Sequence, residues 1–296
     1  MSEITARFVT GAPQNLEERF ASRAAHMKPS EIRSLFAVAS RPEIVSLAGG
    51  MPNLSAFPMS MMADVVQKLV LTNGAEALQY GSGQGHPKLR EQICEVMALE
   101  GIRANPDDVL VTTGSQQALD LISRIFIDPG DVVLVEAPSY VGALGTFHQY
   151  EASVIHVETD GSGLVPAGLR DAISRVRASG RKIKFLYIIP NYQNPSGVLL
   201  PAERRTEILN ICREAEIFVV EDNPYGLLGF DKPSPNAMRA RTLRMLFISE
   251  LFQRQSLLDY ELAGLSYPPH LKKKWLSLVN LQFYVHLISQ IGRAHV

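Results

Sequence analysis

DVLVTTGSQQALDLISRIF, residues 108–126, contains the pattern that decides the fold. Up to Thr113 it is an apolar, β-branched run of the kind that forms buried strands. Gly114 then allows a tight turn, and Ser115 is a good residue to cap a helix. Apolar side chains follow at helical spacing, at Ala118, Leu119, Ile122, Ile125 and Phe126. We therefore predict a strand that ends at Thr113 and leads directly into a helix.

The start of this predicted helix has a chemical use. Free backbone N–H groups and the positive end of the helix dipole would face an anion there, such as a phosphate. An ordinary capped helix is the other interpretation of the same residues. The segment lacks GxxxxGK[ST], and no GxGxxG follows a strand elsewhere in the chain, so neither nucleotide-binding motif is present.

Three more apolar runs read as strands, at residues 132–137, 185–190 and 217–222. Such continuous runs are typical of strands that are buried on both faces, which indicates a mostly parallel sheet. Helical patterns lie between them, among them PAERRTEILNICREAEI at residues 201–217. The alternation predicts the α/β class, in which ligands bind beyond the carboxyl ends of the strands.

The composition excludes several classes of partner. The chain has 296 residues, 46% of them hydrophobic, and a formal net charge of −1. This balance favours neither nucleic acid nor an anionic membrane as a partner. The N-terminus has no apolar run of signal-peptide length, and no segment is long enough to span a membrane. We expect a soluble cytoplasmic protein without a metal site, with a mitochondrial location as the alternative.

Amide side chains follow the strand predicted at 185–190, in the stretch IIPNYQNPSG. Asn191, Gln193 and Asn194 lie in the loop, and we interpret them as amides directed into a cleft. The alternative is that Asn194-Pro195 is only a turn signal.

Two acids and a tyrosine follow the strand predicted at 217–222. Glu221 and Asp222 stand at its very end, and Tyr225 comes three residues after Asp222. A carboxylate placed there is partly desolvated and needs a cationic partner, unless the strand end is solvated. A phosphate site, an amide, an acid and a tyrosine together suit pyridoxal phosphate, whose ring nitrogen must stay protonated.

Six spaced motifs between about Ile44 and Tyr225 carry a family resemblance: SLAGGMP, YGSGQGHPKLRE, TTGSQQALDLI, DPGDVVLVEAPSY, PNYQNPSG and VEDNPYG. In this order they resemble fold-type I aminotransferases of class I/II, in the branch of 2-aminoadipate and kynurenine aminotransferases. The resemblance implies the fold of the pyridoxal-phosphate-dependent transferases, with a three-layer α/β/α large domain. It also implies an enzyme that transfers an amino group between an amino acid and a 2-oxo acid.

The resemblance further implies roles at the cofactor. Ser115 and Gln116 would lie at its phosphate, and Tyr140 would stack on its ring. Asn194 would bind the ring hydroxyl oxygen, with help from Tyr225.

The same resemblance assigns three more positions. Asp222 would pair with the protonated ring nitrogen, and Gly50 would lie near the substrate carboxylate. Tyr80 would reach the phosphate bound by a second copy, which implies a homodimer. Asn223 departs from the aspartate common in this branch, and we expect this difference to matter little.

One residue that the family requires is missing. The family has a lysine in a Ser-x-Ser-Lys segment after the next strand, and this lysine forms the Schiff base with the cofactor. The strand is present at residues 244–249, but no lysine follows near Phe252. Lys272, Lys273 and Lys274 come later as a cluster, which is typical of a solvated face.

We interpret the tail as a shifted reading frame. With suitable codons for Leu251 to Ser266, the frame that begins at the last base of the Leu251 codon encodes Leu-Ser-Lys-Thr-Ile-Ser-Pro-Gly-Leu-Arg-Val-Gly-Trp-Ile-Val. This is the missing segment at its expected place. The last six residues, IGRAHV, can be encoded by a common sequencing adapter, which supports the same interpretation. A natural, divergent tail is the alternative.

These observations predict three parts of the chain. Residues 1–45 form an arm with one helix that begins near Pro29, and residues 46–250 form an incomplete large domain. Residues 251–296 form an aberrant, out-of-frame tail in place of the small domain. We expect no native-like structure from about residue 253 onward and no transaminase activity without the lysine. A lyase or decarboxylase of the same fold and a non-catalytic fragment remain as alternatives.

Overall fold

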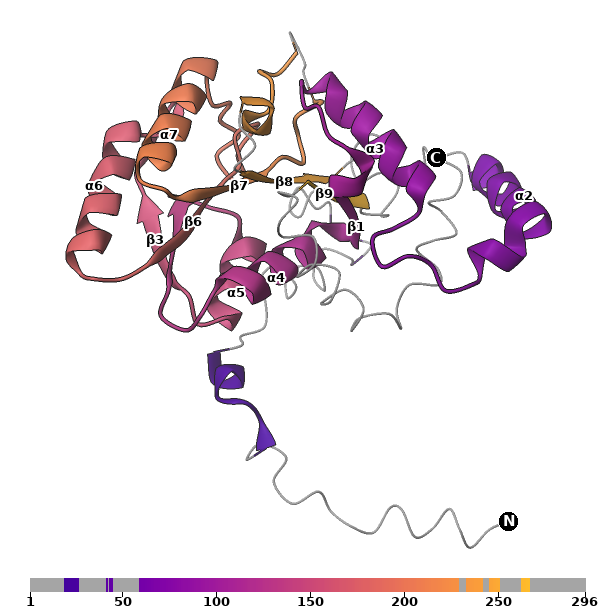
Figure 1. The fold of residues 1–296 in the computed structure, drawn as a ribbon, viewed down its shortest axis with the longest axis horizontal. Coiled ribbons are helices and arrows are strands. Elements are labelled where there is room, and N and C mark those ends of the chain that lie inside the picture. The colour runs from indigo at the N-terminus through magenta and orange to yellow at the C-terminus, as the bar shows by residue number, and fades with distance from the viewer. Residues whose placement is uncertain are drawn as a thin grey trace, which may run out of the picture.

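The computed structural model describes residues 19–26, 41, 43–44, 59–228, 233–241, 245–250 and 262–266. Most of them build a seven-stranded sheet with helices on both faces (Figure 1). The strand order is β1-β9-β8-β7-β6-β2-β3, and β4 and β5 pair separately. The predicted three-layer α/β/α architecture is confirmed.

The main sheet is parallel except at β9. β2 pairs in parallel with β3 and β6, β6 with β7, and β7 with β8, whereas β9 is antiparallel to both β1 and β8. The strands of this sheet are β1 (Val109–Thr113), β2 (Val132–Glu136), β3 (Ser153–Val157), β6 (Ile183–Ile188), β7 (Phe218–Asp222), β8 (Met245–Glu250) and β9 (Leu262–Ser266). The ribbon consists of β4 (Thr159–Asp160) and β5 (Gly163–Leu164). Each strand predicted from an apolar run is present, and the half-exposed edge strand β3 is the one parallel strand that the pattern missed.

Helices connect the strands and cover the sheet. The α-helices are α2 (Met59–Ala77), α3 (Pro87–Leu99), α4 (Gly114–Phe126), α5 (Val141–Gln149), α6 (Pro166–Ala178) and α7 (Ala202–Glu214). Short 3-10 helices are η3 (Ser22–His26), η5 (Pro106–Asp108) and η6 (Met238–Arg241). Figure 1 shows α4 and α5 on one side of the sheet and α6 and α7 on the other. The helix predicted to begin near Pro29 lies outside the described residues.

The core consists of two layers because successive strand residues point to opposite faces. Val133 and Val135 of β2 pack with α4 and α5, and their neighbours Val132 and Leu134 pack with α6 and α7. All four side chains are fully buried. The sheet is therefore covered on both faces. The carboxyl ends of its parallel strands, called the carboxyl edge below, are where a site can form.

β9 is the point at which the structure departs from our expectation for the tail. We expected no native-like structure after about residue 253, yet Leu262–Ser266 inserts between β1 and β8. In the shifted frame the same five codons read Val-Gly-Trp-Ile-Val, which is also a strand-like sequence. An apolar or small residue stands at each of the first four positions in either frame, which suits a central strand. Residues 251–261 and 267–296 lie outside the described part.

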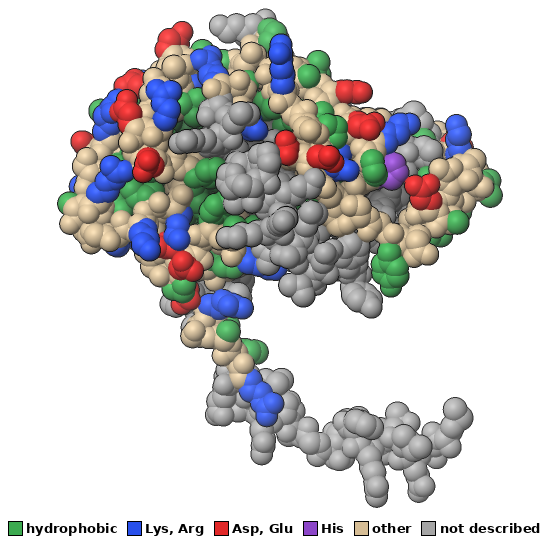
Figure 2. Space-filling view, viewed as in Figure 1, with side chains coloured by type: hydrophobic (Ala, Val, Ile, Leu, Met, Phe, Trp, Pro, Cys, Tyr) green, Lys and Arg blue, Asp and Glu red, His purple; other side chains and the backbone are tan. Residues whose placement is uncertain are grey.

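Charges of both signs are mixed on the face that Figure 2 shows. Figure 2 shows basic and acidic side chains interspersed around α6 and α7, as expected from the near-neutral composition. In the part of the chain that the structure describes, no helix has the length and apolar character needed to cross a membrane.

Candidate functional site

The carboxyl ends of β2, β6 and β7 lie side by side because these strands are parallel neighbours. The segments that follow them carry Tyr140, Asn194 and Tyr225, while Asp222 is the last residue of β7. Tyr140 and Tyr225 both belong to the apolar cluster between the sheet and α4 and α5. The topology thus brings these four predicted site residues to one edge.

Asp222 is buried, with only 3% of its surface exposed. Its Oδ2 atom accepts a hydrogen bond of 2.5 Å from the Tyr187 hydroxyl, whereas its Oδ1 atom is buried and has no hydrogen-bond partner in the part of the chain that the structure describes. Desolvation raises the pKa of Asp222 to about 6, against the lowering effect of the Tyr187 hydrogen bond. The strand end is therefore not solvated, and one buried acceptor atom has no donor among the described residues.

Tyr187, on β6, is a site residue that our sequence analysis missed. It is fully buried, and its ring meets the Phe147 ring edge-to-face at a centroid distance of 5.5 Å. The signal was a tyrosine inside the aliphatic run FLYIIP, because a buried tyrosine hydroxyl needs a polar partner. The sequence did not show which residue this partner is.

Glu221 points away from Asp222, toward η6. Its two carboxylate oxygens accept hydrogen bonds from the backbone N–H groups of Met238, at 2.8 Å, and Arg239, at 2.7 Å. It thereby satisfies donors at the start of η6 that the short helix leaves unpaired. Burial raises the pKa of Glu221 to about 7, although these hydrogen bonds oppose the shift. Glu221 therefore belongs to the scaffold.

The loop after β6 corrects our interpretation of its amides. Gln193 does not point into a cleft: its side chain donates to the Pro138 carbonyl at 2.8 Å and accepts from the Ser196 N–H at 2.9 Å. Asn191 is fully buried and donates to the Asn223 side chain at 2.7 Å. Asn194 alone of the three is half-buried, and it makes no hydrogen bond within the described part of the chain.

Arg205 on α7 anchors the start of the loop that follows β6. It is fully buried, and its guanidinium donates to the Pro190 carbonyl at 3.1 Å and to Asn191 Oδ1 at 2.6 Å. Its other donors reach the carbonyl oxygens of Leu200, Pro235 and Asn236. Desolvation lowers the pKa of Arg205 to about 10. A single side chain thus fixes both the start of the Asn194 loop and the segment before η6.

Asn223 matters more than we expected from the sequence. Its amide group donates to the buried Glu100 carboxylate at the end of α3 and accepts from Asn191. Burial raises the pKa of Glu100 to about 7, and the Asn223 hydrogen bond opposes the shift. Asn223 therefore connects the segment after β7 with α3 and with the Asn194 loop.

Glu136, the last residue of β2, is a second buried acid that our sequence analysis did not single out. It is 1% exposed, and its Oε2 atom accepts a hydrogen bond of 2.9 Å from the Ile189 N–H. Desolvation raises the pKa of Glu136 to about 8. The signal was the charged end of the run VVLVEA, on the strand next to β6.

The start of α4 differs from the prediction by two residues. The cap position is Thr113, not Ser115, and the Thr113 N–H donates to the Gln117 side chain at 2.5 Å. Gly114 has a φ of 76°, which only glycine adopts without strain. Ser115 is buried in the first turn, and the Gln116 side chain donates to Thr146 on α5 at 2.5 Å. The predicted strand–glycine–helix junction is confirmed, but its cap is not the predicted one.

Tyr140 lies over Gly142 at the start of α5. A Cβ atom at Gly142 would fall 2.5 Å from the Tyr140 Cζ atom, closer than real Cβ contacts. The absence of a side chain at position 142 thus gives the Tyr140 ring its place beside the carboxyl edge.

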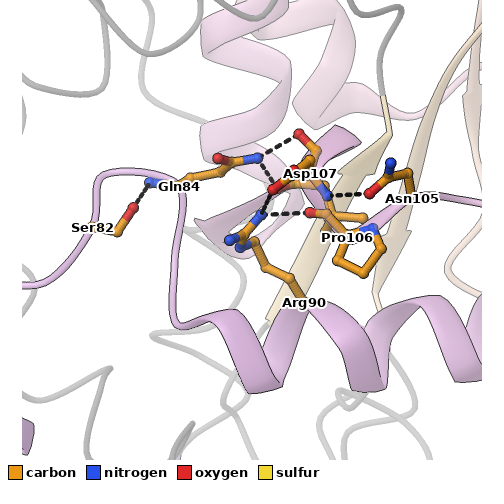
Figure 3. A network of polar contacts seen from close by, with 7 residues as sticks. Ser82, Gln84, Arg90, Asn105, Pro106 and Asp107 are labelled. Carbon is orange, nitrogen blue, oxygen red and sulfur yellow. Dashed lines mark hydrogen bonds and ion pairs between the residues drawn. The ribbon is translucent and has the colours of Figure 1, made fainter.

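Tyr80 is 77% exposed in the loop between α2 and α3. Figure 3 shows how this loop is anchored on η5: Gln84 donates to the carbonyls of Asp107, at 2.7 Å, and Val109, at 3.0 Å. Arg90 donates to the Pro106 carbonyl at 2.6 Å. The loop is therefore held to the edge of the sheet while Tyr80 projects from it.

Two predicted positions cannot be placed, because Gly50 and the segment around Phe252 lie outside the described residues.

Comparison with known proteins connects this geometry to a family. The family described as Aminotransferase class I and II matches residues 43–251. Aromatic-amino-acid aminotransferase 1 of Thermococcus litoralis is 38% identical over 215 residues, which are 72% of this chain and 52% of that protein. The 2-aminoadipate transaminase of Thermus thermophilus is 38% identical over 218 residues, 74% of this chain and 52% of that protein.

A solved structure agrees with these relatives. Kynurenine aminotransferase of Pyrococcus horikoshii, in complex with PMP, has a TM-score of 0.85 and 31% identity, over 94% of this chain and 70% of that one. The chain spans about half the length of the curated relatives named above.

Proposed function

Because this chain belongs to the aminotransferase class I and II family, we propose that residues 46–250 bind pyridoxal phosphate at the carboxyl edge of the sheet. The intact protein then transfers an amino group between an amino acid and a 2-oxo acid. We further propose that the amino donor is aromatic or resembles 2-aminoadipate, as the names of the relatives suggest.

The Asp222 carboxylate is the observation that carries the proposal. It is buried at the strand end, where Tyr187 holds one oxygen and no described residue bonds to the other. A buried acceptor of this kind suits a cationic N–H donor, because the charge pair offsets the cost of burial. The protonated ring nitrogen of pyridoxal phosphate is such a donor. Asp222 would hold the proton on that nitrogen.

Four other residues would bind and orient the cofactor. When bound, pyridoxal phosphate supplies an electron-accepting ring that makes the substrate Cα–H bond acidic. Tyr140 would cover one face of the ring, and the half-buried Asn194 amide, with Tyr225, would bind the ring hydroxyl oxygen. Ser115 and Gln116, in the first turn of α4, would bind the phosphate through their backbone N–H groups.

We also propose that the intact protein is a homodimer. Tyr80 is 77% exposed, as a side chain that completes a second copy's site would be. Val66, Val70, Leu71 and Leu78 on and beside α2 are also exposed, although they are apolar. Such a surface suits coverage by a second copy.

The chain as written should lack transaminase activity, because it carries no lysine near Phe252. We propose that residues from about 252 onward are read in the wrong frame. The missing lysine and the adapter-like ending IGRAHV support this proposal, whereas the pairing of Leu262–Ser266 with β1 and β8 runs against the expectation that an out-of-frame tail has no regular structure.

Binding of pyridoxamine phosphate (PMP) to the purified chain tests the proposal, because this ligand needs no covalent attachment. We expect saturable binding that weakens at least about tenfold in Asp222→Asn, where the charge is lost. Glu203→Gln, an exposed acid on α7, is the matched control and should bind normally. A wild-type chain that folds but does not bind pyridoxamine phosphate would contradict the proposed function.

A further inference from the structure

Tyr187 and Asp222 come from adjacent strands, and their side chains meet at the carboxyl edge. We propose that Tyr187 is a positioning residue, which aims the Asp222 carboxylate at the ring nitrogen of the cofactor and stabilises its charge. This inference rests on the proposed function and assigns a role to a residue outside all six sequence motifs.

The register of β6 and β7 creates the contact. Tyr187 pairs with Val220, and both side chains belong to the cluster on the α4 and α5 face. Asp222 is two residues beyond Val220, so it points to the same face one step nearer the edge. The long tyrosine side chain spans that step, and its hydroxyl donates to Asp222 Oδ2 at 2.5 Å.

The tyrosine ring is held so that it can direct the carboxylate. It is fully buried, with Phe147 edge-on at a centroid distance of 5.5 Å and an interplanar angle of 74°. Because the Tyr187 hydroxyl, on a ring that is itself held by packing, donates to one oxygen of Asp222, the carboxylate cannot rotate freely. Its other oxygen, Oδ1, is left buried, with no partner among residues 19–26, 41, 43–44, 59–228, 233–241, 245–250 and 262–266. Tyr187 thereby determines which oxygen stays available.

Charge is the second part of the role. Desolvation and the neighbouring Glu221 raise the pKa of Asp222, whereas the Tyr187 hydrogen bond lowers it. Desolvation by burial raises the pKa of the Tyr187 hydroxyl most, followed by Asp222 and then by Tyr140 and Glu136, so the hydroxyl stays a donor. Without this hydrogen bond, a larger share of Asp222 would be protonated near neutral pH, and a neutral carboxyl is a poor partner for a cationic N–H.

The test compares two ligands and two Tyr→Phe variants. The ligands are pyridoxamine phosphate and its analogue in which a C–H group replaces the ring nitrogen, and the measured quantity is the ratio of their dissociation constants. Tyr187→Phe removes the hydroxyl at Asp222. Tyr150→Phe is the matched control, because Tyr150 also donates to an aspartate, Asp120 at 2.8 Å, but precedes the start of β3 instead of lying at the carboxyl ends of the strands.

We expect the wild-type chain and Tyr150→Phe to prefer pyridoxamine phosphate by about tenfold or more, and Tyr187→Phe to lose most of this preference. Weaker binding of both ligands by the same factor in Tyr187→Phe would show a merely structural role and overturn the inference. An unchanged preference would also overturn it. A wild-type chain that binds neither ligand would overturn the proposed function, and this inference with it.

A second substitution at position 187 retains the hydroxyl, and it tests the same role even where Tyr187→Phe destabilises the fold. In the variant Tyr187→3-fluorotyrosine, fluorine makes the hydroxyl a stronger hydrogen-bond donor, while the shape of the side chain hardly changes. We expect the preference for pyridoxamine phosphate to rise and the nitrogen NMR signal of the bound ligand to move toward the protonated form. No change in either quantity would contradict the role of Tyr187.

Discussion

Glu221 and Asp222 are neighbours in the chain, but their carboxylates lie on opposite faces of the sheet. Glu221 accepts two backbone N–H groups at the start of η6, and Asp222 accepts the Tyr187 hydroxyl on the side of α4 and α5. The alternation of side chains along a strand thus gives one acid a structural role and leaves the other for a ligand. The two roles predict separable effects.

Glu221→Ala should lower the stability of the fold strongly and change the affinity for the ligand little. It leaves the buried N–H groups of Met238 and Arg239 unpaired, and each such donor costs about 1–3 kcal/mol. We expect a loss of about 3 kcal/mol in the free energy of unfolding, measured by urea denaturation. Asp222→Asn should lose ligand affinity with a much smaller change in stability. Equal stability losses in the two variants would argue against this division.

Stability should fall as pH rises from about 5 to about 8. Glu136 has an ordinary pKa of 4.5 that burial raises to about 8 in the folded chain. Between these values the folded state holds a proton that the unfolded state has released. The contribution of Glu136 is therefore complete below the unfolded pKa and is lost as pH approaches the folded value.

Glu136→Gln should flatten this decline, because the glutamine oxygen still accepts the Ile189 N–H and cannot ionise. Urea midpoints of both chains across the pH range provide the measurement. Glu100 and Glu221, whose pKa values rise to about 7, should leave a residual slope in the variant. Identical slopes in the two chains would count against a protonated Glu136.

Asn223→Asp should destabilise the chain, and more strongly above neutral pH. The substitution removes the amide group that donates to Glu100. A second buried carboxylate then lies against the Glu100 carboxylate. We expect a loss of about 2–3 kcal/mol in the free energy of unfolding once both acids ionise. Adding Glu100→Gln should restore much of the loss, because the glutamine amide can donate to the new aspartate. No rescue in the double variant would show that the two side chains are not coupled.

Gly142→Ala and Gly145→Ala are a matched pair on α5. A Cβ atom at Gly142 would meet the Tyr140 ring at 2.5 Å, whereas a Cβ atom at Gly145 meets nothing within 4 Å. Gly142→Ala should displace the ring and weaken pyridoxamine phosphate binding by about tenfold, if one stacking contact is lost. Gly145→Ala should bind normally and be more stable by about 1 kcal/mol, since alanine favours the helix. Ligand titrations and thermal unfolding of both variants decide the point.

The apolar runs allowed the strands to be predicted, because central parallel strands are buried on both faces and leave little ambiguity. Site residues could be proposed from the residues alone where they end or follow a strand, as Asp222 and Asn194 do. Tyr187 and Glu100 escaped because their partners are distant in the sequence: Tyr187 meets Asp222 across 35 residues, and Glu100 meets Asn223 across 123. Arg205 escaped because only the fold shows that its guanidinium is buried against Pro190 and Asn191. Only the strand register and the packing of α3 and α7 show these pairs. The amides Asn191 and Gln193 were misinterpreted for the same reason.

The last prediction concerns the lysine. β8 is parallel to β7, and Ile248 pairs with Asp222, so the segment that follows β8 leaves the sheet at the same edge as Asp222. In the shifted frame that segment carries a lysine at the place of Arg254. A chain with one nucleotide added near the Phe252 codon should therefore retain the cofactor covalently after borohydride reduction, which mass spectrometry detects. The chain as written, and a restored chain with alanine in place of that lysine, should both carry no covalently bound cofactor after the same reduction. Covalent cofactor on the chain as written, or a source transcript with an intact frame through Phe252, would refute the shifted frame.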